Sequence, residues 1–83
     1  MSIELRYSPR ADALYVEFNT RTIAYTDDIS RNDYYERGVD YAEDDTLVGV
    51  ELLNVSRGVD LTDVPRADEV ARLLAAHDIR ALV

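Results

Sequence analysis

The sequence predicts an α+β protein: a small antiparallel β-meander of about five strands with one C-terminal α-helix packed on the sheet. Through the first two thirds of the chain, apolar and polar residues alternate at the period of half-buried strands. Residues 38–54 hold two such runs on either side of the polar break 43–46, a pattern typical of a β-hairpin. Residues 66–77 change to a helical period.

The first two strands are expected at residues 3–7 and 13–18. One face carries Ile3, Leu5 and Tyr7 in the first strand, and Leu14, Val16 and Phe18 in the second. Pro9 breaks the first strand because proline has no N–H to donate to a ladder. The short connection makes the two strands antiparallel neighbours, and Asp12 is expected to stabilise the turn as a hydrogen-bond acceptor.

A third strand is expected at residues 23–26, followed by an exposed polar loop or frayed strand end at 27–33. The chain re-enters β structure at 34–37 and continues into the central hairpin. Asp44 or Asp45 can adopt the left-handed conformation that the hairpin turn requires, because Asx residues tolerate it.

Two rows compete on the last strand. The row Val48, Val50 and Leu52 is purely apolar and should face the core, whereas Leu47, Gly49, Glu51 and Leu53 form the other row. Gly49 should leave space there for a neighbouring aromatic ring. We expect the C-terminal segment to cover Leu47 and Leu53.

That segment contains the one expected helix, over residues 66–77. Thr62 or Asp63 offers an N-cap, and Pro65 fits a first helical turn. The apolar side of the helix carries Ala67, Val70, Ala71, Leu73 and Leu74. The chain is therefore one domain, 1–83, with a β-sheet core at 1–56 and a loop, helix and apolar tail at 57–83; the tail could pack back or add a strand.

Size limits how such a domain can be stabilised. A chain of 83 residues buries roughly 60–65% of its unfolded surface, and domains of this size are commonly stabilised further by disulfides, a metal ion or self-association. There is no cysteine, and His77 is the only histidine, so neither a disulfide nor a Cys/His metal site is expected. We expect no cofactor, and a homodimer, joined through an edge strand or the helix face, is one way to bury more surface.

The net charge of −8 is unevenly distributed. Residues 27–51 contain nine acidic residues against Arg31 and Arg37, a net −7. Such a stretch keeps a small protein soluble, but it also repels nucleic acid and attracts basic surfaces. A direct nucleic-acid partner is therefore not expected.

Motifs for other functions are missing from the sequence. No stretch approaches the ~20 apolar residues of a membrane span, and the N-terminus does not resemble a signal peptide, so a cytoplasmic protein is expected. No nucleophile elbow, phosphate-binding glycine loop or calcium loop is present, and we expect no enzyme activity.

Three segments resemble a known family. Residues 7–16, Tyr-Ser-Pro-Arg-Ala-Asp-Ala-Leu-Tyr-Val, are similar to the opening Tyr-x-Pro-x-x-Asp-Ala-Leu-Tyr of the small prokaryotic proteins called domain of unknown function 2283. Residues 38–51 resemble its Gly-x-x-x-Asp turn and Val-Gly-Ile-Glu strand, and 52–56 its Ile-Leu-Asn-Ala-Ser ending. Residues 20–35 depart from the pattern, and the helical tail extends beyond it.

The resemblance implies a small β-sheet domain without an established activity. Members of the family often lie beside genes for small toxin-like proteins, so it also implies an antitoxin-like partner role.

These observations lead to a main hypothesis and two alternatives. The main one is a protein-binding module whose acidic, tyrosine-bearing side docks a basic protein, with partner-binding residues Asp40, Tyr41, Glu43, Asp44, Asp45 and Glu51. The first alternative is a metal-dependent hydrolase or small-ligand site that combines Asp12, Asp40 and Glu51 with Tyr15 or Tyr41. The second is a structural protein that mainly self-associates.

Overall fold

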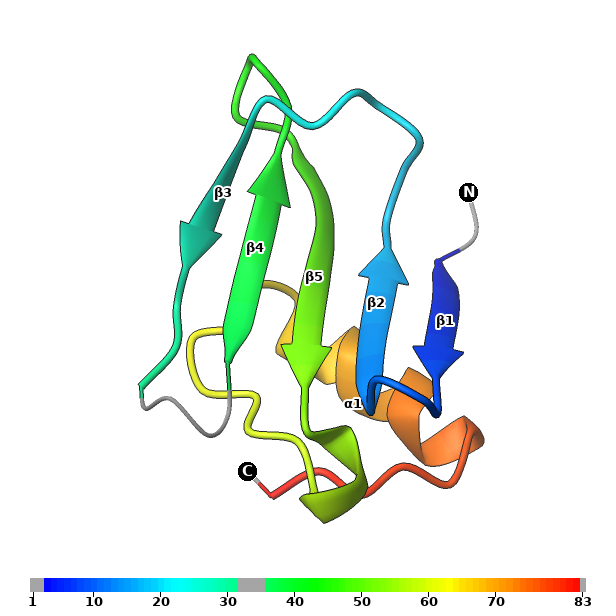
Figure 1. Cartoon of the computed structure of the whole chain (residues 1–83). Coiled ribbons are helices and arrows are strands. Elements are labelled where there is room, and N and C mark those ends of the chain that lie inside the picture. The colour runs from blue at the N-terminus through cyan, green and yellow to red at the C-terminus, as the bar shows by residue number, and fades with distance from the viewer. Residues whose placement is uncertain (1–2, 32–35, 83) are drawn as a thin grey trace.

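A five-stranded antiparallel sheet with one α-helix behind it forms the fold (Figure 1). The computed structural model describes residues 3–31 and 36–82. The elements are β1 (Glu4–Ser8), β2 (Ala13–Glu17), β3 (Tyr25–Asp28), β4 (Arg37–Tyr41), β5 (Leu47–Leu53), the 3-10 helix η1 (Val55–Arg57) and α1 (Ala67–Ala76). The predicted α+β class is confirmed.

The strand order, β1-β2-β5-β4-β3, differs from that of a simple meander. The third strand does not pair with the second, because residues 18–24 cross the end of the sheet and place β3 at the far edge (Figure 1). All four residues of β3 are exposed, including Asp27 and Asp28, whereas β5 is the longest strand and carries the apolar row. The centre of a sheet suits a strand with an apolar row, so β5 lies between β2 and β4. An edge tolerates charged side chains, so β3 lies there.

Strand β3 also begins and ends two residues later than the sequence suggested. It includes Asp27 and Asp28, which were expected in an exposed loop or a frayed strand end, since an edge strand tolerates charged side chains. The expected return to β structure at 34–37 falls partly outside the described residues, and β4 begins at Arg37.

The core lies between the sheet and the C-terminal segment. Alternation brings one row of each inner strand to the helix side, and this cluster of buried residues contains Leu14, Val16, Phe18, Val39, Val50, Leu52, Val55, Val59, Leu61, Val64, Val70 and Leu74. The apolar side of α1 is as predicted, with Ala67, Ala71 and Leu73 packed around Val70 and Leu74.

The face that the C-terminal segment covers is not the expected one. It covers the Val50 and Leu52 row, and the face that carries Gly49 and Glu51 is left open. The C-terminal segment stabilises the fold most by packing on the purely apolar row, because the free energy gained is roughly proportional to the apolar area removed from water.

The start of α1 also differs from the prediction. The residue before the helix is Arg66, in the left-handed conformation with φ 56°, and no side chain caps the helix, so neither Thr62 nor Asp63 is the N-cap. Pro65 precedes the helix. The Arg66 guanidinium instead binds Glu69 at 2.6 Å and lies 4.7 Å from the centroid of the Phe18 ring, which joins the helix start to the residue that follows β2.

A buried arginine holds the segment after the sheet. Arg37 is 3% exposed and lies opposite Leu52, on the helix side. Its guanidinium donates hydrogen bonds to the backbone carbonyl oxygens of Ile29, at 2.7 Å, Asp60, at 3.0 Å, and Thr62. The charge of Arg37 therefore does not offset the carboxylates of the open face.

Asp45 and Gly58 both have a positive φ and lie at reversals of the chain. Asp45 has φ 66°, which confirms the expected role of an Asx residue in the hairpin turn. Gly58 has φ 106°, and a β-carbon there would lie 2.6 Å from a Leu82 methyl group. The tail returns to the fold at this point, where Ala81 forms a single parallel bridge with Val59.

Replacing Leu74 with alanine tests whether the helix is part of the core. Leu74 is fully buried, so its truncation should lower the free energy of unfolding by about 2–5 kcal/mol. Urea denaturation measures the change. Arg72→Ala, at an exposed position of the same helix, is the control and should change stability by less than about 0.5 kcal/mol. An unchanged midpoint for Leu74→Ala would show that the helix contributes nothing to the core.

Candidate functional site

The uncovered face of the sheet carries two rows of residues that cross all five strands; we call these rows the open face. The strand registers place Glu4, Glu17, Gly49, Asp40 and Thr26 in the first row, and Arg6, Tyr15, Glu51, Gly38 and Asp28 in the second. The two rows contain five carboxylates and a single arginine, so the open face is strongly acidic.

Tyr15 crosses the middle of the open face. Its ring lies over Gly49, where an added β-carbon would meet the Tyr15 hydroxyl oxygen at 2.2 Å, which confirms that the glycine makes room for an aromatic ring. The hydroxyl donates to Asp40 Oδ2 at 2.8 Å, and the Thr26 hydroxyl donates to Asp40 Oδ1 at 2.5 Å. Burial and then the bond to Asp40 raise the pKa of Tyr15, so the phenol stays protonated as the donor.

Asp40 therefore joins β2, β4 and β3 from a position that is 8% exposed. Its side chain accepts from the two neutral hydroxyls of Tyr15 and Thr26, and no ion pair involves it within residues 3–31 and 36–82. Two donors satisfy the carboxylate in part, as a buried polar group requires. Asp40 thus contributes to the fold as a hydrogen-bond acceptor within the open face.

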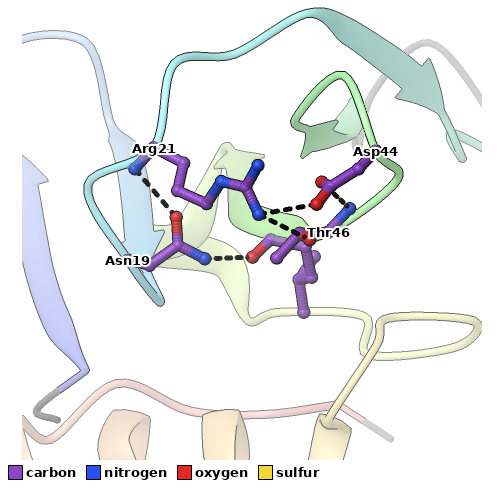
Figure 2. A network of polar contacts seen from close by, with 5 residues as sticks. Asn19, Arg21, Asp44 and Thr46 are labelled. Atoms are coloured by element: carbon purple, nitrogen blue, oxygen red, sulfur yellow. Dashed lines mark hydrogen bonds and ion pairs between the residues drawn. The ribbon is translucent and has the colours of Figure 1, made fainter.

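The turn between β4 and β5 holds a second acidic group, shown in Figure 2. The Arg21 guanidinium donates to Asp44 Oδ2 at 2.8 Å and to the Thr46 hydroxyl at 3.0 Å, and Asn19 donates to the Leu47 carbonyl oxygen at 2.6 Å. Hydrogen bonding to Thr46 and then to Arg21 lowers the pKa of Asp44 to about 2. These contacts join residues 18–24, which cross the end of the sheet, to the turn between β4 and β5.

Asp45 of the same turn accepts a hydrogen bond of 2.5 Å from the Tyr25 hydroxyl. This bond raises the pKa of Tyr25 to about 12. The Tyr25 ring stacks on that of Tyr41, with centroids 5.3 Å apart. The pair joins the edge strand β3 to β4.

The six residues proposed from sequence to bind a partner thus fall into two groups. Asp40 and Glu51 lie on the open face, and Tyr41, Glu43, Asp44 and Asp45 lie at or beside the turn. Asp40, Tyr41, Asp44 and Asp45 already have partners within the chain, although Asp44 and Asp45 are exposed, as Glu43 and Glu51 are. The open face also contains Glu4, Glu17 and Asp28, which the sequence did not single out because the strand order was needed to align them.

The carboxylates of the alternative hydrolase site are brought together only in part. Tyr15 binds Asp40 and lies opposite Glu51, but Asp12 lies in the turn beyond the start of β2. Within residues 3–31 and 36–82, no three His, Asp or Glu side chains are grouped in a way that could hold a metal ion.

Asp12 instead joins that turn to the 3-10 helix η1, as a hydrogen-bond acceptor. It accepts from the Ser56 backbone N–H at 2.9 Å, the Ser56 hydroxyl at 2.7 Å and the Tyr7 hydroxyl at 3.1 Å. The bond from Ser56 is the largest of the causes that lower the pKa of Asp12. Next to this network is a cavity of about 400 Å³, lined by Leu5, Tyr7, Val55, Ser56, His77, Asp78, Ile79 and Arg80.

A family model described as Protein of unknown function (DUF2283) matches residues 4–56. The chain belongs to this family. The match spans all five strands and the Tyr7–Asp12–Ser56 network, and it ends before α1. No curated protein and no solved structure matches the chain. In the described part of the chain, no helix is both long enough and apolar enough to cross a bilayer.

Gly49→Ala tests the packing at the centre of the open face. The new methyl group would displace the Tyr15 ring and break its bond to Asp40, so the free energy of unfolding should fall by about 1–3 kcal/mol. Gly38→Ala is the matched control, because its β-carbon would meet only the Thr26 methyl group, at 3.1 Å. In a double-mutant cycle, Tyr15→Ala should cost less in the Gly49→Ala background than in the original chain. Additive effects would contradict the contact.

Arg21→Ala tests the electrostatics of the turn. The pKa of Asp44 should rise from about 2 toward its ordinary 3.8 but not reach it, since the bonds from Thr46 remain. Because the folded pKa is depressed, the stabilising contribution of Asp44 is present above pH 4 and is lost as the pH falls through 2. The difference in the free energy of unfolding between the original chain and Arg21→Ala should therefore narrow as the pH falls from 4 to 2. Carboxyl NMR titration measures the pKa, and Arg66→Ala, which removes the contacts with Glu69 and Phe18 but none with Asp44, should leave it unchanged.

Proposed function

We propose that this chain is a protein-binding module, and that its open face docks a protein with a basic surface. The observation that carries the proposal is the composition of the two rows, five carboxylates against Arg6. Arg37, which the sequence count placed among the neutralising charges, is buried on the opposite side.

The placement of these carboxylates supports recognition of a cationic partner. Glu4 and Glu17 lie directly opposite each other on neighbouring strands, where like charges repel. Glu51 is exposed beside Gly38, which has no side chain to screen it. Lysine or arginine side chains of a partner would relieve this repulsion, so the surface favours a basic protein over an acidic one.

The Tyr15 ring supplies the apolar part of such an interface. It lies between the carboxylates, held over Gly49 by its bond to Asp40, and the Arg6 guanidinium is 5.4 Å from its centroid. A fixed aromatic ring loses little conformational freedom on binding, and tyrosine is enriched at interfaces for that reason among others. Arginine side chains of the partner could stack on such a ring in the same way.

The partner class that we propose is a small basic protein of the ribonuclease-like toxin kind, with this chain acting as an antitoxin-like binder. The family resemblance supports the antitoxin role, and the acidic open face supports the charge of the partner. The same face repels phosphate backbones, so we propose that the chain contacts the partner rather than nucleic acid, and that it acts by binding rather than by catalysis.

Charge reversal at Glu51 tests this proposal. Immobilised protein is used to capture partners from the native host, and the captured proteins are compared for the original chain, Glu51→Lys and Asp68→Lys. Glu51 is on the open face and Asp68 is exposed on α1, so both changes alter the net charge equally. A basic protein should be captured by the original chain and by Asp68→Lys. Its association rate should fall at least about tenfold for Glu51→Lys, and should also fall with added salt.

Two outcomes would count against the proposal. One is the capture of acidic or neutral proteins only. The other is an equal loss of binding for Glu51→Lys and Asp68→Lys, which would indicate a general charge effect rather than docking on the open face.

A further inference from the structure

Strand β1 forms one edge of the sheet and pairs only with β2 among the described segments. Its outer side therefore presents backbone N–H and C=O groups along five residues, which is a template for another strand. Figure 1 shows the same edge, with β1 at one side of the sheet and α1 behind it. Pro9, which has no N–H, follows directly and limits how far such pairing can extend.

The two edges of the sheet differ in charge pattern. Strand β3 carries Asp27 and Asp28 and no cation, so two copies of it placed side by side would bring four carboxylates together. Charges of this kind protect an edge against pairing. Strand β1 carries one carboxylate and one guanidinium, Glu4 and Arg6, two residues apart on the same face.

The sequence of β1 is complementary to itself in one antiparallel register. With Leu5 opposite Leu5 of a second copy, Glu4 lies opposite Arg6 of that copy, and Ile3 lies opposite its Tyr7. Both charged pairs fall on the open face, and the apolar residues all fall on the helix side. Opposite charges and apolar residues placed across neighbouring strands are the pairs that stabilise antiparallel sheets.

Repulsion within the single chain favours this pairing. Glu4 faces Glu17 across β1 and β2, and the Arg6 guanidinium contacts Glu17 at 3.3 Å. Glu4 has no ion pair within residues 3–31 and 36–82. The Arg6 side chain is 58% exposed, and a guanidinium has five N–H donors, so it can bind the Glu4 of a second copy while keeping Glu17.

The helix side of β1 has room for the apolar residues of a second copy. Tyr7 is 42% exposed there. A hollow of about 330 Å³ lies beside Ile3 and is lined by Ile3, Glu69, Arg72, Leu73 and Ala76. In the Leu5-centred register, Tyr7 of the second copy lies opposite Ile3, at the edge of this hollow. In the same register, Ile3 of the second copy lies next to the cavity described above, which Leu5 and Tyr7 help to line.

We propose that β1 is a dimerisation strand, which joins two copies of this chain into a continuous ten-stranded antiparallel sheet about a twofold axis at Leu5. Because paired residues share a face, both open faces lie on one side of this sheet and both helices on the other. The proposal does not depend on the identity, or the existence, of a basic partner.

Complementary charge variants test the proposal by sedimentation velocity and native mass spectrometry. The original chain should dimerise. Glu4→Arg would place two arginines opposite each other at each end of the register, and Arg6→Glu would place two glutamates there, so each variant alone should dissociate at least about tenfold more readily. An equimolar mixture of the two should form heterodimers, because every pair then joins opposite charges. The double variant Glu4→Arg/Arg6→Glu should dimerise again.

The variants separate assembly from folding. Glu4→Arg places a cation opposite Glu17 of its own chain, so it should fold at least as stably as the original while dimerising less. If Arg6→Glu fails to fold, the dimer stability of Glu4→Arg can still be compared with that of the double variant Glu4→Arg/Arg6→Glu, and this comparison tests the proposal. Asp27→Arg, on the other edge, is the control and should leave the dimer unchanged. A monomeric original chain at millimolar concentration would overturn the proposal. So would a Glu4→Arg dimer of undiminished stability, or a mixture without heterodimers.

Discussion

Residue 49 has no side chain, and the arrangement of the open face depends on this. The space above Gly49 allows the Tyr15 ring to cross from β2 over β5 and reach Asp40 on β4. Asp40 in turn accepts a bond from Thr26 on the edge strand. A single row of contacts thus connects four of the five strands on the face opposite α1. The centre of the acidic surface is therefore held by an aromatic ring and its hydrogen bond, and not by other charges.

Much of this fold could be predicted from local patterns. The strands alternate because one face of each is buried, the turn uses Asp45 because Asx residues tolerate positive φ, and Gly49 marks the place of an aromatic ring. The apolar side of α1 was also evident from its period. Each of these features depends on residues that are close together in the chain.

The features that could not be predicted depend on contacts between distant residues. The position of β5 next to β2 follows from which strand takes a central place with a neighbour on each side, and a reading of consecutive strands cannot make that comparison. Arg37 looked like one surface charge among many, but its guanidinium binds backbone carbonyl oxygens, which no sequence pattern marks. The site was predicted in part for the same reason. Glu51 was identified, but the alignment of Glu4, Glu17 and Asp28 with it requires the strand order.

The boundary of the family match has a consequence for the part of the chain that lies beyond it. The match ends at residue 56, yet Val59, Leu61, Val64, Val70 and Leu74 supply five members of the buried cluster. Without them, Val16, Val50 and Leu52 would form a contiguous water-exposed apolar surface, and surfaces of that kind aggregate or recruit another molecule. The C-terminal third of this chain therefore covers the apolar face of the sheet, and an isolated 4–56 fragment would need another molecule to cover that face.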